Sequence, residues 1–200
     1  MTTVKEPIKL SMIEVALRQF EETADDMNLN PDVRKILAIT NNEIVVNFPV
    51  KMDNGKIEIF TGYRVQHNNV LGPYKGGLRY HPTMEIGDAR ALAMWMTWKT
   101  SLAGLPYGGA KGGIQIDPKL YSAGELERIT RRFTYALGDN IGPEHDIPAP
   151  DVNTNAQTMA WIADTYMSTK SPAERSKFQH VVTGKPVGSG GLEGRDRATG

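Results

Sequence analysis

The sequence contains no cysteine and no long apolar run. Without cysteine, a disulfide framework and thiolate chemistry, as a metal ligand or as a nucleophile, are excluded. The first twenty residues carry charges at Lys5, Glu6, Lys9 and Glu14, so they have neither the hydrophobic stretch of a signal peptide nor the length of a membrane span. We therefore expect a cytoplasmic protein with no membrane partner.

An excess of charge of one sign is also absent, because 23 Lys and Arg balance 23 Asp and Glu. Such a chain has no overall field to attract nucleic acid, so a small-molecule partner is expected. With 40% hydrophobic residues, the 200-residue chain can bury one sizeable core. We predict one domain over residues 1–182 and a less regular, Gly- and Pro-rich linker over residues 183–200.

Several familiar site patterns are missing. The four histidines lack close metal-ligand spacing, so we predict no metal site. Lys111 lies in a glycine-rich run but has neither the preceding glycine nor the following Ser or Thr of a phosphate-binding P-loop. Gly188 and Gly190 are followed by Glu193 where the dinucleotide fingerprint G-x-G-x-x-G needs its last glycine. No dinucleotide-binding (Rossmann) domain is therefore expected within the chain.

Helical and strand-like segments alternate along the chain. Capping-box pairs, Ser11 with Glu14 and Ser122 with Glu125, predict helices over residues 12–27 and up to residue 137. An Asp-Asn-Gly turn predicts a hairpin between strands 43–51 and 56–66. Further helices are expected near residues 32–39, 85–102 and 155–167, and further strands near 114–116 and 147–150.

The pattern is typical of an α/β fold, in which the early hairpin makes the sheet mixed and helices flank it. The glycine-bearing segments 71–80 and 106–113 are predicted to be loops, which puts Lys111 at a loop-to-strand junction. Thr83 is a possible N-cap of the helix over residues 85–102.

Three lysines stand in small or apolar surroundings: Lys75, Lys99 and Lys111. They are either surface lysines beside flexible glycines or functional groups, and three such contexts within forty residues favour function. Burial near the other two lysines would lower the pKa of Lys111 and make it a base. Asp151 follows two prolines that stiffen its approach, so it suits proton transfer; alternatively, it belongs to a helix N-cap region.

At these positions the sequence resembles a known family. The segments GPYKGGLRYHP, MTWKTSLAGLPYGGAKGG and PAPDVNTN resemble, in order and spacing, the signatures of glutamate dehydrogenases within the Glu/Leu/Phe/Val dehydrogenase family. The resemblance is strong from residue 62 to residue 200. It implies that Lys75, beside Gly76, binds the side-chain carboxylate of glutamate and that Lys99 binds the main-chain carboxylate. Lys111 would be the catalytic lysine and Asp151 the proton-transferring aspartate.

Two further positions take roles from the resemblance. Met96 stands at a substrate-contacting position where many relatives have glutamine, and Thr199 would touch the nicotinamide end of the cofactor. Relatives that act on leucine, phenylalanine or valine have an apolar residue at the position of Lys75, so this lysine argues for a second carboxylate on the substrate.

The resemblance implies the N-terminal, substrate-binding and oligomerisation domain of a glutamate dehydrogenase. The whole enzyme would convert L-glutamate to 2-oxoglutarate and ammonia, using NAD or NADP bound mainly by a C-terminal domain, and would form a homo-oligomer, commonly a hexamer. The fragment alone is expected to be inactive. The alternatives are an isolated module that only oligomerises and binds dicarboxylates, or a dehydrogenase for branched-chain or aromatic amino acids.

Overall fold

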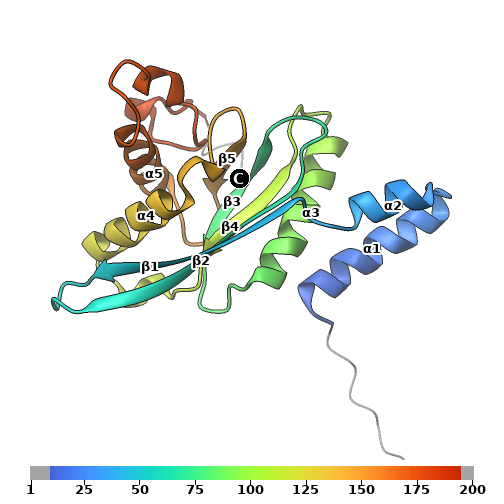
Figure 1. Ribbon diagram of the computed structural model, residues 1–200, viewed down its shortest axis with the longest axis horizontal. Helices are drawn as coiled ribbons and strands as arrows, with labels where there is room; N and C mark the ends of the chain where they lie inside the picture. Colours follow the sequence, from blue (N-terminus) through green and yellow to red (C-terminus); the bar gives the residue numbers. More distant parts are fainter. Residues whose placement is uncertain (1–9, 195–200) are drawn as a thin grey trace, which may run out of the picture.

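A computed structural model describes residues 10–194 and has a five-stranded mixed sheet at its centre (Figure 1). The spatial order of the strands is β1-β2-β4-β3-β5. β2 is antiparallel to both β1 and β4, whereas β3 is parallel to both β4 and β5. The predicted α/β class with a mixed sheet is thus confirmed. The strands are β1 (Asn42–Lys51), β2 (Ile57–Asn68), β3 (Tyr74–Tyr80), β4 (Gly109–Ile114) and β5 (Asp146–Pro150).

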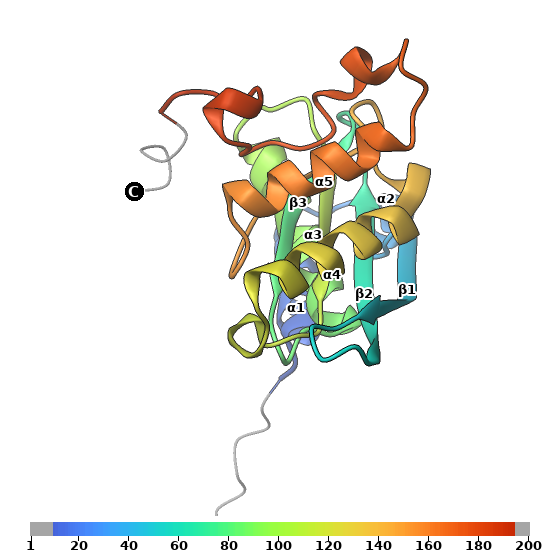
Figure 2. The ribbon, with the colours of Figure 1, turned by 90° about the vertical axis from the view of Figure 1, so that its left-hand side faces the viewer.

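Helices cover both faces of the sheet (Figures 1 and 2). α4 and α5 lie on one face, and α3 lies on the other with α1 packed on its outer side. The helices are α1 (Met12–Asp26), α2 (Pro31–Leu37), α3 (Ile86–Leu102), α4 (Ala123–Leu137) and α5 (Ala156–Ser168). Short 3-10 turns occupy Pro118–Leu120, Gly138–Asn140, Arg175–Phe178 and Val187–Ser189. Within residues 10–194, no helix is long and apolar enough to cross a membrane.

Local sequence signals place the starts of α1 and α4 and the hairpin correctly. The backbone N–H of Glu14 donates to Ser11 Oγ, and the Glu14 carboxylate accepts from the Ser11 backbone at 2.7 Å, which completes the predicted capping box. The same reciprocal bonds join Ser122 and Glu125 at the start of α4. Gly55, with φ of +81°, supplies the left-handed residue of the β1–β2 turn.

The two glycine-bearing segments predicted as loops are strands, and this prediction was wrong. A Cβ on Gly76 in β3 would lie 1.5 Å from the carbonyl oxygen of Ala110, and one on Gly109 in β4 would lie 2.1 Å from Thr97 Oγ1. These glycines are required because neighbouring backbone and α3 approach closely. The strand that was predicted at residues 114–116 is β4, which begins and ends earlier in the chain, at Gly109 and Ile114. Thr83 is not the N-cap of α3 either; its hydroxyl bonds to His81, and α3 begins after Glu85 without a side-chain cap.

The main core lies between the sheet and the α4–α5 layer, where Phe48, Leu78, Ile114 and Phe133 are fully enclosed. On the other side, Ala16, Phe20 and Ala24 of α1 pack against α3, and Phe20 stacks on Trp98 with ring centroids 5.6 Å apart. The apolar face of α1 is therefore used within the chain. The predicted domain boundary near residue 182 stays a prediction.

Candidate active site

Lys111 lies in the middle of β4, so the predicted loop-to-strand junction was wrong. It is paired across the sheet with Val65, which packs against Ala89 and Ala93 of α3. Because cross-strand partners share a face, the Lys111 side chain leaves the sheet on the α3 side. Only 5% of its surface is exposed, as the sequence predicted.

Asp151, the first residue after β5, brings its carboxylate to Lys111. Asp151 Oδ1 lies 2.9 Å from Lys111 Nζ, and Oδ2 accepts a hydrogen bond from Arg79 Nε at 2.7 Å. A Cβ on Gly77 would lie 2.6 Å from the Cβ of Asp151, so only glycine leaves room for the aspartate here. The N-cap of α5 is Asn155, which excludes that role for Asp151.

Burial and charge perturb both groups. Burial lowers the pKa of Lys111; the hydrogen bond and charge of Asp151 oppose this change, and Arg79 and Arg64 reinforce it. The lowered pKa of Lys111 agrees with the sequence prediction. The cations that contribute to it are Arg79 and Arg64, whereas the sequence had suggested Lys75 and Lys99. Burial alone would raise the pKa of Asp151, and the contacts with Lys111 and Arg79 outweigh it, so the pKa of Asp151 is lowered.

Lys75 lies on β3, the strand beside β4. Its ammonium group donates to Thr183 Oγ1 at 2.8 Å and to the carbonyl oxygen of Ile147 at 3.2 Å. β3 lies between β4, which carries Lys111, and β5, which directly precedes Asp151. A second lysine therefore lies on the strand between the two elements that supply the Lys111–Asp151 pair.

Three other predicted site residues lie on β3 and α3, namely Gly76, Met96 and Lys99. A Cβ on Gly76 would approach Met96 Cγ to 3.4 Å, so Gly76 and Met96 meet where α3 crosses β3. Lys99 is exposed and lines a cavity of about 700 Å³ between α1 and α3, beside Phe20 and Leu102. In the part of the chain that the structure describes, its side chain makes no hydrogen bond or ion pair. Thr199 lies outside the described residues.

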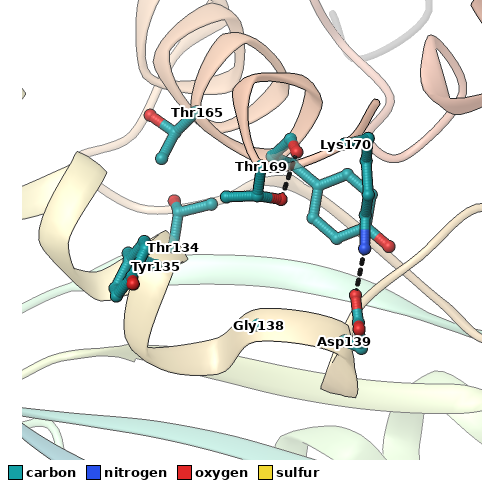
Figure 3. Close-up of a pocket in the computed structure, with 8 residues that line it drawn as sticks. Thr134, Tyr135, Gly138, Asp139, Thr165, Thr169 and Lys170 are labelled. Atoms are coloured by element: carbon teal, nitrogen blue, oxygen red, sulfur yellow. Dashed lines mark hydrogen bonds and ion pairs between the residues drawn. The ribbon is translucent and has the colours of Figure 1, made fainter. Parts of the chain in front are cut away.

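A second cavity, of about 320 Å³, lies between α4 and α5 (Figure 3). Lys170 at its rim is paired with Asp139, and its ammonium group lies 4.6 Å from the centre of the Tyr166 ring. Neither cavity is lined by Lys111 or Asp151. Among the described residues, no group of three or more His, Asp or Glu side chains could hold a metal ion.

Sequence reasoning missed two arginines. Arg79 stands two residues after Gly77, and the alternation with Lys75 would have pointed to it if the segment had been assigned to a strand. Arg64 on β2 is fully buried and binds both carboxylate oxygens of Asp146, with Nε 2.8 Å from Oδ2. No local pattern marks this pair, because 82 positions separate the partners.

Residues 40–168 match the family described as Glu/Leu/Phe/Val dehydrogenase, dimerisation domain. The chain is similar to the glutamate dehydrogenase of Thermotoga maritima, with 51% identity over 190 residues that cover 95% of this chain and 45% of the relative. It is 47% identical to the NAD-specific glutamate dehydrogenase A of Halobacterium salinarum, covering 95% of this chain and 43% of that one. The chain therefore spans less than half the length of these relatives.

Solved structures of similar proteins have the same fold. Glutamate dehydrogenase from Peptoniphilus asaccharolyticus superimposes with a TM-score of 0.90 at 41% identity, covering 95% of this chain and 47% of that chain. The hetero-hexameric glutamate dehydrogenase from Thermus thermophilus, in a leucine-bound form, gives 0.87 at 43% identity, with 96% and 45% covered. The shared part in each case is less than half of the relative's chain.

Proposed function

The chain belongs to the Glu/Leu/Phe/Val dehydrogenase family, and from this premise we propose that it is the substrate-binding part of an NAD(P)-dependent glutamate dehydrogenase. The proposed reaction of the whole enzyme is the oxidative deamination of L-glutamate to 2-oxoglutarate and ammonia. The observation that carries the proposal is the ion pair between the buried Lys111 and Asp151, beside the strand that carries Lys75. Asp151 remains 21% exposed, so substrate can reach the pair.

Each residue then has a chemical task. Burial lowers the pKa of Lys111, so a neutral amine is accessible to act as base for the water that attacks the substrate iminium. Asp151 moves protons to and from the substrate nitrogen. Lys75 binds the distal carboxylate of glutamate by a charge-assisted hydrogen bond. The role of Lys99 at the main-chain carboxylate, like that of Gly76 and Met96 at the substrate, rests on the sequence motif.

NAD or NADP supplies the hydride acceptor of this reaction. Residues 10–194 do not fit a dinucleotide, because the G-x-G-x-x-G fingerprint is absent and the sheet lacks the doubly wound parallel order of dinucleotide-binding domains. We therefore propose that the cofactor is bound outside these residues, with Thr199 at its nicotinamide end.

Self-association is also proposed. Val45, Ile57 and Ile59 are 52%, 68% and 66% exposed on one face of the β1–β2 hairpin, where an apolar surface favours a protein partner. The matching family is described as a dimerisation domain, and the Thermus thermophilus relative is a hetero-hexamer. A homo-oligomer, hexameric in the whole enzyme, is the proposed assembly.

Replacing Lys75 by leucine tests the substrate assignment. The assay uses a hybrid enzyme in which this chain replaces the matching 190 residues of the Thermotoga maritima relative. Loss of the cation that pairs with the distal carboxylate is expected to lower kcat/KM for glutamate by about 10²-fold or more, and to admit apolar amino acids. The melting temperature should change little. Lys119→Leu, at an exposed lysine, is the matched control, and an unchanged kcat/KM in Lys75→Leu would refute the assignment.

The 200-residue chain by itself is expected to fold and self-associate without reducing NAD or NADP in the presence of glutamate. The reason is that its core is complete, whereas the described part has no dinucleotide site. Light scattering measures the assembly, and absorbance of the reduced nicotinamide measures turnover in the same sample. Turnover by this chain would contradict the proposal that the cofactor is bound outside residues 10–194. A monomer would contradict the proposed assembly.

A further inference from the structure

The Asp151 carboxylate is held at both oxygens by cations from two different strands. Lys111 on β4 contacts Oδ1 at 2.9 Å, and Arg79 on β3 donates to Oδ2 at 2.7 Å. The Arg79 and Asp151 side chains are 23% and 21% exposed, so the contact between them is partly shielded from water. The arrangement differs from a surface ion pair, whose geometry is loose and whose contribution is small.

The rest of the structure fixes the backbone of Asp151 but not its carboxylate. The backbone N–H donates to Thr154 Oγ1 at 2.8 Å, and Thr154 in turn donates to the carbonyl oxygen of Leu78 at 2.7 Å. Gly77 allows the Asp151 Cβ to approach β3. The terminal torsion of an aspartate is broad, so without a second hydrogen bond the carboxylate can rotate about its bond to Cβ.

We propose that Arg79 is a positioning residue, which holds one Asp151 oxygen so that the other faces Lys111 in the geometry that proton transfer needs. The inference rests on the proposed roles of Lys111 and Asp151. Arg79 is bound to the carboxylate through Nε, and its action on the reaction passes through that contact. A misplacement of about 1 Å at a reacting group can lower a rate about 10²-fold, so a side chain that fixes orientation can matter as much as a reacting one.

Arg79 also acts through its charge. Burial lowers the pKa of Lys111, and the positive charge of Arg79 lowers it further. Burial by itself would raise the pKa of Asp151. The contacts with Lys111 and Arg79 lower this pKa by more, so the net change is a lowered pKa. Removing Arg79 is therefore expected to raise the pKa of both groups. The pH range in which Lys111 is neutral while Asp151 is ionised moves to higher pH.

Three variants of the hybrid enzyme test the inference. Arg79→Met removes both the charge and the hydrogen bond, and is expected to lower kcat about 10- to 100-fold at neutral pH with little change in KM for glutamate. Its pH–rate profile should move to higher pH. Arg79→Lys keeps the charge, so its pH profile should stay near that of the parent while kcat recovers in part. Arg131→Met is the matched control, because Arg131 on α4 is likewise a partly buried arginine in ion pairs, but its partners are Glu127 and Asp164.

Titration of the 200-residue chain itself separates this inference from the proposed reaction. Carbon-13 NMR of the Lys111 ε-carbon, assigned with Lys111→Met, reports its pKa without any turnover. The inference is supported if the pKa rises in Arg79→Met and remains low in Arg79→Lys and Arg131→Met. It is overturned if the pKa is the same in all variants, or if Arg79→Met raises KM and leaves kcat and the pH profile unchanged. An inactive parent hybrid with the expected NMR shifts would count against the proposed reaction alone.

Discussion

Lys111→Met in the hybrid enzyme is expected to lower kcat by about 10³-fold, within the range that general acid–base groups contribute. Methionine fills a similar volume but cannot accept a proton, so water would attack the substrate without a base. Below the pKa of Lys111, kcat of the parent should rise with pH, because only the neutral amine can act. Since burial lowers that pKa from the ordinary lysine value, the rise begins at lower pH than for a solvated lysine, and it should vanish in the variant.

The fold should survive this change. Asp151 keeps its contact with Arg79, and an apolar side chain suits an enclosed position. Thermal unfolding followed by circular dichroism checks this point. Lys170→Met is the matched control, because Lys170 is also ion-paired with an aspartate but lies between α4 and α5. A kcat within about threefold of the parent would contradict the role of Lys111 as base, since even a modest general base contributes about 10²-fold.

Asp146→Leu is expected to lower the free energy of unfolding by about 3–5 kcal/mol, a large part of the stability of an ordinary domain. Asp146 and Arg64 are both fully buried, and Gln66 Nε2 also donates to the carboxylate at 2.9 Å. Leucine would leave the Arg64 guanidinium with only the carbonyl oxygens of Gly76 and Gly77. A buried cation without a counter-charge is costly.

Denaturant unfolding of the 200-residue chain measures this effect. Glu22→Leu is the control, because Glu22 is also 2.8 Å from an arginine, Arg18, but at an exposed i,i+4 pair. It should change stability by less than about 0.5 kcal/mol. The double variant Arg64→Met with Asp146→Leu should recover most of the loss, since neither charge then remains buried. A single Asp146→Leu variant as stable as the parent would show that the pair is not needed for the fold.

Much of the local structure could be predicted. The capping boxes at Ser11 and Ser122 and the turn at Gly55 rely on hydrogen bonds or dihedral angles within a few residues, so the sequence nearby is sufficient. The mixed sheet followed from the hairpin and the alternation of elements. β3 and β4 were missed because their glycines are selected by the close approach of Ala110 and Thr97, which come from other elements.

The same division applies to the site. The spacing and chemistry of the lysines, together with the family resemblance, were enough to single out Lys75, Lys111 and Asp151. The sequence could not show that Arg79 holds the other Asp151 oxygen, or that the cations near Lys111 are arginines. Nor could it show that Lys99, which was expected near the end of α3, is exposed beside a cavity between α1 and α3.

By itself, the sequence determined the elements built from local hydrogen bonds, the α/β class and the residues worth testing. Only the tertiary structure decided which side chains are enclosed and which charges surround them. The physical reason is range: a cap or a turn is completed within about four residues, whereas the burial and pKa of Lys111 depend on groups from β2, β3 and the end of β5. Those groups become neighbours when the sheet forms.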